Sequence, residues 1–173
     1  MRIITTPMCE DVLKIAGLTN YEVVRPDNIK NADIAILLSE TKSDVPKISI
    51  KLNTYMQIYE SILTISEKFN SSVNYEKIEL IQKLIKENSD KKFERQKISV
   101  KVYSNFLKET VSDMGFSLND TDYDYVVCPD YLEDTVTGEN LIIIPSHKNV
   151  SINIIDRINE RYEYLERELC MKQ

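Results

Sequence analysis

Cys9 is the side chain in this sequence whose type and position could do chemistry. It lies in the segment TTPMCED, residues 5–11, between a short apolar opening and a stretch with helical periodicity. A thiol in the first turn of a helix feels the positive end of the helix dipole and lies near backbone N–H groups, and both effects favour the thiolate. The carboxylates of Glu10 and Asp11 act against this, because neighbouring negative charge disfavours a thiolate. Cys9 is therefore a candidate nucleophile, and the alternative is a small, partly buried residue.

Other motifs of phosphate or metal chemistry are incomplete. The chain has three glycines, so neither GxGxxG nor GxxxxGK[ST] can be written. Residues 120–124 begin like a calcium loop, but Tyr125 and Tyr131 stand where Gly and Glu are required, so a solvated turn is the preferred interpretation. His147 is the single imidazole: any histidine relay must use it, and the simpler interpretation is a cap of the turn before the last helix.

Composition and charge exclude several classes of protein. The net charge of −6 is modest and the charged residues alternate in sign, whereas nucleic-acid binding needs a basic stripe. The opening lacks the apolar segment of a signal peptide, and no run approaches the roughly 18 apolar residues of a membrane span, so we expect a cytoplasmic protein without a membrane partner. Three cysteines, no CxxC and one His argue against a disulfide framework and a zinc site, and no metal is expected.

Short strands alternate with helical patterns along the chain, which predicts an α/β fold with mainly parallel strands and helices on both faces of the sheet. In the first half we expect strands at 3–5, 21–24, 33–39 and 48–52, and helices at 10–16, 54–69 and 75–88. The charged stretch 89–96 is typical of a linker. In the second half we expect strands at 97–102, 124–128 and 141–144, and helices at 105–114 and 151–169.

The two halves share a pattern. Gly17-Leu18 and Gly115-Phe116 each follow a first helix, where a glycine supplies the left-handed residue that ends it. The long helices 54–69 and 151–169 carry apolar residues at three- and four-residue steps. We therefore predict a first α/β half at 1–88, a linker at 89–96 and a second half at 97–173. The alternative is one doubly wound sheet whose halves look alike.

In open α/β sheets a ligand binds at the carboxyl ends of the strands. Ser104 and Asn105 follow one such strand, as Cys9 follows another. The candidate ligand-binding residues at these ends are Thr5, Thr6, Met8, Ser39, Glu40, Cys128, Asp130, Ser146 and His147.

The opening RIITTPMCEDVLKIAG, with its cysteine at position 9 after a first strand, resembles the HcgF family, the F member of the proteins that build the iron-guanylylpyridinol (FeGP) cofactor of mononuclear iron hydrogenase. The resemblance covers about the first seventeen residues and the overall organisation. It implies that Cys9 forms a thioester with the carboxyl group of guanylylpyridinol, after an adenylating enzyme of the same pathway has activated that carboxyl group. The thioester would be the precursor of the acyl ligand to iron. Guanylylpyridinol would be a substrate, with no permanently bound cofactor.

The implied chemistry is consistent with the residues around Cys9. A thiolate can displace AMP from an acyl-adenylate, and the thioester keeps the carbonyl group activated. Thr5, Thr6 or N–H groups of the first helical turn could stabilise the oxyanion, and Glu10 is the nearest candidate base. Only Cys9 carries over by motif, so the guanosine and pyridinol contacts stay unassigned.

The alternative function is a non-catalytic binding module for a nucleotide-like small molecule, with a cleft between the two α/β halves and Cys9 at its rim. It explains the repeated pattern equally well and requires no reactive thiol, so whether the protein is an enzyme stays open. Part of either apolar helical stripe could serve a homodimer interface.

Overall fold

A computed structural model describes residues 1–146 and 152–170 of the chain. The chain divides into two compact units, Met1–Lys83 and Leu84–Gln173. His147 lies outside the described residues.

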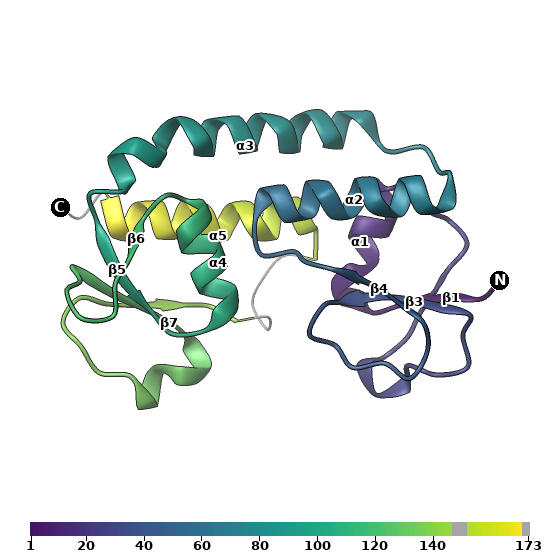
Figure 1. Cartoon of the computed structure of the whole chain (residues 1–173), viewed down its shortest axis with the longest axis horizontal. Helices are drawn as coiled ribbons and strands as arrows, with labels where there is room; N and C mark the ends of the chain where they lie inside the picture. Colours follow the sequence, from purple (N-terminus) through teal and green to yellow (C-terminus); the bar gives the residue numbers. More distant parts are fainter. Residues whose placement is uncertain (147–151, 171–173) are drawn as a thin grey trace. The chain divides into compact units, whose positions relative to one another are not determined.

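Unit 1 contains a parallel sheet of four strands in the order β2-β1-β3-β4. The strands are β1 (Ile3–Thr5), β2 (Glu22–Val23), β3 (Ile34–Leu38) and β4 (Lys47–Ile50), and the helices are α1 (Pro7–Ile15), the 3-10 helix η1 (Pro26–Asn28), α2 (Tyr55–Phe69) and the first part of α3 (Tyr75–Arg95). In Figure 1, α1 and α2 lie on the same side of this sheet.

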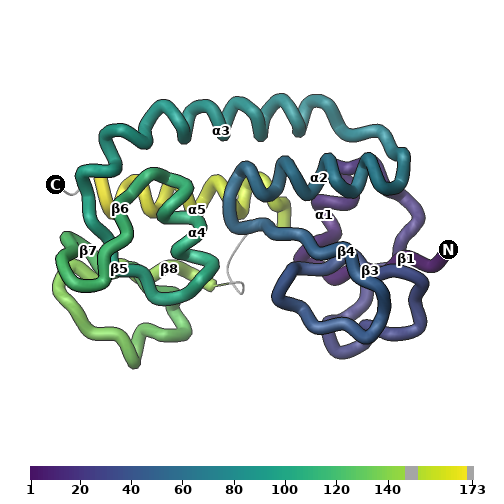
Figure 2. The backbone as a smooth tube through the Cα atoms, viewed as in Figure 1, coloured from purple at the N-terminus to yellow at the C-terminus, as the bar shows by residue number. Residues whose placement is uncertain are grey.

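Unit 2 repeats the arrangement, with parallel strands in the order β6-β5-β7-β8. Its strands are β5 (Ser99–Val102), β6 (Ser117–Leu118), β7 (Tyr125–Pro129) and β8 (Leu141–Ile144), and its helices are the end of α3, α4 (Asn105–Asp113), the 3-10 helix η2 (Asp130–Thr135) and α5 (Ile154–Cys170). The backbone of each unit runs through a central strand, a helix, an edge strand and back to the centre (Figure 2). The predicted α/β fold in two repeated halves is confirmed, and the single doubly wound sheet is not found.

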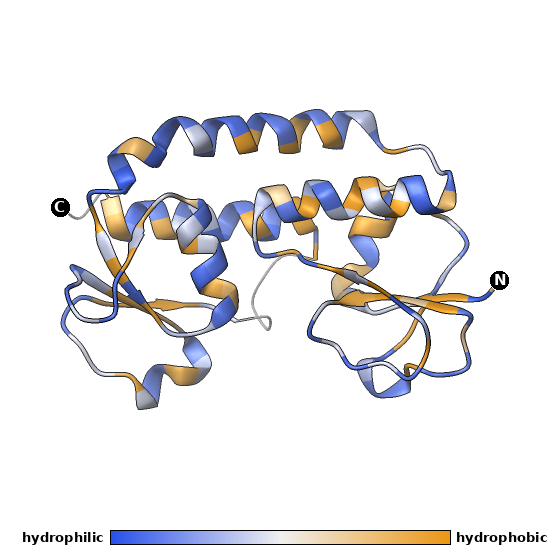
Figure 3. Ribbon diagram, in the orientation of Figure 1, coloured by the Kyte–Doolittle hydropathy of each residue, from blue (hydrophilic) through white to orange (hydrophobic). Residues whose placement is uncertain are grey.

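The strands β1, β3 and β7 are apolar and largely buried, because both of their faces are covered (Figure 3). In unit 1, residues of one face of β1 and β3 pack under the loop segment that contains η1: Ile4, Ala35 and Leu37 contact Val24 and the partly buried Ile29, Ala32 and Val45. In unit 2 the segment around η2 plays the same part, with Val126 and Cys128 packed against Val136 and Leu132. These small hydrophobic clusters cover the faces opposite the main helices.

Gly17 and Gly115 end α1 and α4 as the sequence predicts. Their φ angles are +77° and +96°. The N–H of Leu18 donates to the carbonyl of Leu13, and the N–H of Gly17 to that of Lys14. This is the double hydrogen bond of the Schellman motif, and the residues around Gly115 repeat it.

Helix α3 corrects the predicted linker at 89–96, because the helix continues to Arg95. The boundary between the units falls within this helix. Lys86 and Asp90 form an ion pair one turn apart on its exposed side. Near its end, Arg95 donates to the side chain of Asn88 and to the carbonyl of Met114. Tertiary contacts thus stabilise the helix at residues 89–95, although the charge pattern alone indicates a linker there.

The start of α1 is also earlier than predicted. The helix begins at Pro7 instead of Glu10, and Thr6 precedes it in an extended conformation. Proline suits this first position, because its fixed φ is helical and its missing N–H would have no intrahelical acceptor there. Cys9 consequently lies in the first turn, as expected, and the short elements β6, η1 and η2 were not predicted.

Candidate functional site

Cys9 is placed where the sequence predicts but is inaccessible. Its N–H donates to the carbonyl of Thr6 at 3.0 Å, and the Thr6 hydroxyl donates to the Cys9 sulfur at 3.8 Å. The Cys9 side chain is 0% exposed and that of Thr6 is buried. Glu10, the candidate base, forms an ion pair with Lys14 at 2.9 Å. In this conformation the thiol is therefore a buried group at the start of a helix. It agrees better with the alternative of a small buried residue than with an attacking nucleophile.

The other predicted residues of unit 1 are divided between the core and the surface. Thr5 is buried, and its hydroxyl donates to the carbonyl of Ile36 at 2.8 Å across the sheet, so it is structural. Met8 is partly buried in the first turn of α1. At the end of β3 the Ser39 hydroxyl donates to Glu40 at 3.0 Å, and Glu40 is exposed. Glu40 is thus the exposed one among the predicted residues of this edge, and Ser39 and Met8 are partly buried.

In unit 2 the structure brings together two predicted residues, Asp130 and Ser146. The Asp130 carboxylate accepts hydrogen bonds from the N–H and the hydroxyl of Ser146, at 2.9 and 3.0 Å. This contact joins the carboxyl end of β7 to the carboxyl end of β8. Cys128 is fully buried, and burial raises the pKa of its thiol, with Glu133 adding to the effect. Cys128 therefore belongs to the core and not to the predicted binding edge.

Ser104 begins α4 in an unusual conformation. It directly follows β5, its φ is +107°, and its hydroxyl accepts a hydrogen bond from the N–H of Leu107. Residues other than glycine rarely adopt such an angle, and where they do the surrounding structure holds them there. The sequence places Ser104 and Asn105 at the carboxyl edge, which agrees with the structure; the strain of Ser104 could not be read from the sequence.

Two arginines of α5 were missed by sequence reasoning. Arg157 is buried at 7% exposure, and Arg161 is partly buried with its guanidinium 5.1 Å from the centre of the Phe106 ring. Burial, together with the positive charge of Arg157, lowers the pKa of Arg161 to about 10. The four-residue spacing of the arginines on a predicted helix was a usable signal, because residues at that spacing share one helix face.

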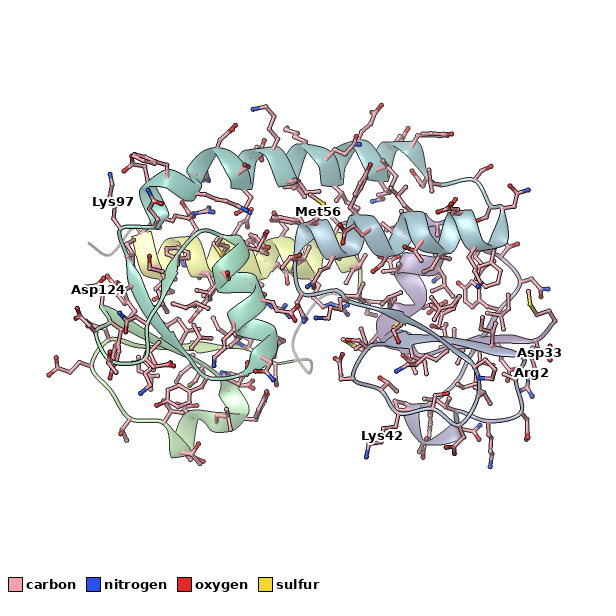
Figure 4. All side chains as sticks on the ribbon, viewed as in Figure 1. Arg2, Asp33, Lys42, Met56, Lys97 and Asp124 are labelled. Carbon is pink, nitrogen blue, oxygen red and sulfur yellow. The ribbon has the colours of Figure 1, made fainter. Side chains whose placement is uncertain are left out.

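Unit 2 also contains a pocket of about 670 Å³ at the opposite, amino-terminal edge of its sheet. Lys97, Asp124 and Asn140, which come just before β5, β7 and β8, line it together with Arg95 and Glu166. Lys97 and Asp124 are labelled in Figure 4. No sequence motif indicates this pocket. It also lies at the edge opposite to the one where parallel sheets usually bind ligands.

The charges around this pocket are largely matched. Arg95 forms an ion pair with Glu166, and Lys97 forms one with Glu94 at 2.6 Å. Cys170 also lines the pocket, and burial raises the pKa of its thiol. A pocket with internally paired charges offers little net attraction to a charged ligand, so we do not place the functional site here.

Within residues 1–146 and 152–170, no group of three or more His, Cys, Asp or Glu residues is arranged to hold a metal ion. In the same residues, no helix has the length and apolar character needed to cross a membrane.

Comparison with known families gives a match to the second half of the chain. The model of the MJ0786 family C-terminal domain matches residues 96–170, which begin just before β5 and end with the last residue of α5. An uncharacterized protein of Methanocaldococcus jannaschii, MJ0786, is 27% identical over 179 residues, which cover 94% of this chain and 90% of that protein. The chain is similar to MJ0786 proteins. Neither match names the iron-guanylylpyridinol pathway, so the resemblance to the HcgF family stays a prediction.

Solved structures resemble the whole chain in fold. The periplasmic vitamin B12 binding protein BtuF of Vibrio cholerae has a TM-score of 0.62 at 11% identity and covers 99% of this chain and 98% of its own. A mutant of FpvC from Pseudomonas aeruginosa has a TM-score of 0.67 at 11% identity, with all of both chains covered. A Zn(II)-bound mutant of AdcAII from Streptococcus pneumoniae has a TM-score of 0.59 at 12% identity, covering 98% of this chain and 99% of its own. Identities this low show the shared two-unit α/β fold alone.

Proposed function

We propose that this protein is a binding module for a small molecule, which it holds at the carboxyl edges of its parallel strands. The observation that carries the proposal is the repeated parallel sheet, in which polar side chains follow the ends of the strands while the candidate nucleophile is buried. Ser39 and Glu40 lie at this edge in unit 1, and Asp130 and Ser146 in unit 2. Parallel α/β sheets bind ligands at this edge in general.

The fold likeness supports the same function. A vitamin B12 binding protein is among the structures that the whole chain resembles. The likeness does not specify a ligand for this chain, since one fold serves many ligands. We therefore propose the function at the level of reversible binding of a small organic molecule.

The thioester reaction at Cys9 is a second candidate. The position of Cys9 in the first turn of α1 favours it, because the helix dipole would stabilise a thiolate once the thiol became accessible. The 0% exposure of Cys9 opposes it, because an acyl-adenylate cannot reach the sulfur unless the start of α1 opens. On present geometry, reversible binding is the better-supported function.

One experiment separates the two functions. The full chain and its Cys9→Ser variant are incubated with an unfractionated extract of methanogen cells supplemented with ATP, so that small molecules and the adenylating enzyme are both present, and each is then repurified and measured by native and by denaturing mass spectrometry. The binding module predicts a mass increase that appears in the native spectrum of both proteins and disappears on denaturation. The thioester predicts an increase that survives denaturation, is removed by hydroxylamine and is absent in Cys9→Ser. No increase in either spectrum would contradict both functions.

A further inference from the structure

Strand β4 is an outer strand of the sheet in unit 1 and pairs with β3 on one side (Figure 1). The N–H of Ala35 donates to the carbonyl of Pro46, and the N–H of Ser39 donates to the carbonyl of Ile50. The even-numbered residues of β4 therefore direct their main-chain groups toward β3. The main-chain groups of residues 47, 49 and 51 point away from the sheet.

The outward side of β4 has open main-chain groups. The carbonyl of Lys51 accepts a hydrogen bond from the Ser61 hydroxyl at 3.1 Å. Within residues 1–146 and 152–170, the main-chain N–H and carbonyl groups of Lys47 and Ser49 have no hydrogen-bond partner. Ser49 is also exposed. Two donors and two acceptors in a row are the pattern to which an extended peptide adds as a further strand.

A pocket of about 220 Å³ lies beside this open edge. Residues 49–51 line it on the side of β4, and four residues of α2 line the other side: Gln57, Glu60, Ser61 and Thr64. The four residues follow each other at steps of one, three and four, which places them on one face of the helix. Pockets for small organic molecules are larger, at about 300–1,000 Å³. This pocket therefore suits a single polar side chain of an added strand.

Exposed apolar side chains border the pocket on α2. Met56 and Leu63 are 41% and 38% exposed, and each lies three or four residues from Glu60 on the same helix face. Met56 is labelled in Figure 4. A methionine adapts its shape to different partners. An open strand edge, a small polar pocket and an apolar border on a neighbouring helix together form a groove for a peptide.

The charge of the edge indicates which kind of strand it accepts. The Lys47 ammonium donates to the carbonyls of Ser39 and Thr41, at 3.0 and 2.8 Å, and in the described part of the chain it forms no ion pair. Two copies of β4 paired through this edge would bring their lysines together, and like charges across a strand pair are destabilising. Glu60 lines the same pocket as Lys51, so a carboxylate of an added strand fits the Lys47 end.

We propose that the groove between β4 and α2 binds an extended, acidic segment of a partner protein as a fifth strand of the sheet in unit 1. The main chain of that segment pairs with Lys47 and Ser49. One polar side chain enters the pocket, and a carboxylate lies near the Lys47 ammonium. This surface runs along the outer side of β4 and goes beyond the proposed small-molecule function, because a peptide bound here requires no small ligand.

The test selects peptides from a random heptapeptide library displayed on phage, with the full wild-type chain as the target. Enriched peptides are synthesised, and their affinities are measured by fluorescence anisotropy. Ser49→Pro removes an outward N–H but no hydrogen bond to β3, and proline is tolerated at such edge positions. Ser49→Ala is the matched control, because it keeps the N–H. Thr64→Phe fills the pocket from an exposed position of α2.

We expect the enriched peptides to contain Asp or Glu, and to bind about tenfold or more weakly to Ser49→Pro and to Thr64→Phe but equally well to Ser49→Ala. N-methylation of the peptide should abolish binding at alternate residues only, because alternate N–H groups of an added strand face β4. This measurement uses the wild-type chain, so it stands even if a variant fails the check of its fold by circular dichroism.

No enriched peptide, enriched peptides without acidic residues, or equal binding by a folded Ser49→Pro would overturn the proposal. Light scattering tests the other occupant of the edge. A wild-type dimer that dissociates in Ser49→Pro would also overturn the proposal, because a second copy of the chain would then cover the edge.

Discussion

The α-carbon of Gly17 faces the carbonyl oxygen of Ser72 so closely that a methyl group there would lie 2.0 Å from that oxygen. The φ of +77° at Gly17 is also unfavourable for any residue with a Cβ. We expect Gly17→Ala to lower the free energy of unfolding by about 2–4 kcal/mol, since left-handed strain and a backbone clash act together. Urea unfolding measures this change.

Gly138→Ala is the control for this prediction. An added Cβ at Gly138 meets a Val126 methyl group at 3.0 Å, and φ there is not positive. We expect a change of less than about 1 kcal/mol, because a side-chain methyl can move aside. Equal effects of the two substitutions would show that the Gly17 contact is not tight.

Arg95 should be the most costly charge to remove from unit 2. Its side chain is 6% exposed and connects Asn88, the Met114 carbonyl and Glu166. We expect Arg95→Met to lower the free energy of unfolding by about 3–5 kcal/mol, because it leaves buried partners without their donor. Chemical unfolding of the single and double variants with Glu166→Gln should give a coupling energy of about 1 kcal/mol or more.

Lys86→Met is the comparison for Arg95. Lys86 is exposed and pairs with Asp90 on the surface of α3. Surface pairs contribute little, so this variant should unfold like the wild type. A loss as large as that of Arg95→Met would mean that burial does not determine the strength of these ion pairs.

Ser89→Pro distinguishes a helix from a linker at 89–96. Ser89 lies in α3, where proline removes an intrahelical hydrogen bond and its ring clashes with the preceding turn. We expect a loss of about 3 kcal/mol in the free energy of unfolding, and a change within a few tenths for Ser89→Ala. A harmless Ser89→Pro substitution would favour the linker.

The order of thiol alkylation tests the cysteine environments. Cys9 and Cys128 are buried, whereas Cys170 is partly exposed. We expect iodoacetamide to modify Cys170 first and the other two only when the protein opens, as measured by peptide mass spectrometry. Selective early modification of Cys9 at neutral pH would instead favour the thioester reaction.

Cys128 should also make stability depend on alkaline pH. Burial raises the pKa of its thiol above the ordinary value of 9.0, so the folded state keeps a proton that the unfolded state has lost. This contribution is fully present below about pH 9 and is lost as the pH rises through the folded pKa, at no more than about 1.4 kcal/mol per pH unit. The difference in unfolding free energy between wild type and Cys128→Ala should therefore shrink as the pH rises above 9.0. A difference that stays constant would contradict it.

Local signals in the sequence predicted most of the fold. Gly17 and Gly115 end their helices in a left-handed conformation, next to backbone hydrogen bonds that reach back only a few residues into the same helix. A sequence pattern can predict such a helix end, because all the residues involved are neighbours in the chain. The continuation of α3 to Arg95 depends on Met114 and Glu166, which are distant in sequence. Local patterns therefore identified the strands other than β6 and missed the end of this helix.

The candidate site was less predictable than the fold. The position of Cys9 in a first turn followed from Pro7 and the helical pattern, but its burial depends on everything packed around it. Arg161 was missed because its environment depends on a contact with the ring of Phe106. The two residues are 55 positions apart in the sequence, and only the fold brings them together. The sequence predicts a ligand at the carboxyl edge of the second sheet, which stays a prediction, and it gives no sign that Arg161 contacts Phe106.

Ser104 shows what the chain tolerates at that edge. Glycine would adopt a φ of +107° with little strain, yet the chain has a serine there and its hydroxyl caps the first turn of α4. When the chain folds, Ser104 must therefore adopt a φ angle that serine rarely has in the unfolded chain. The backbone at the carboxyl edge of unit 2 has a conformation that its local sequence does not prefer, so the packing of the rest of the unit must maintain it.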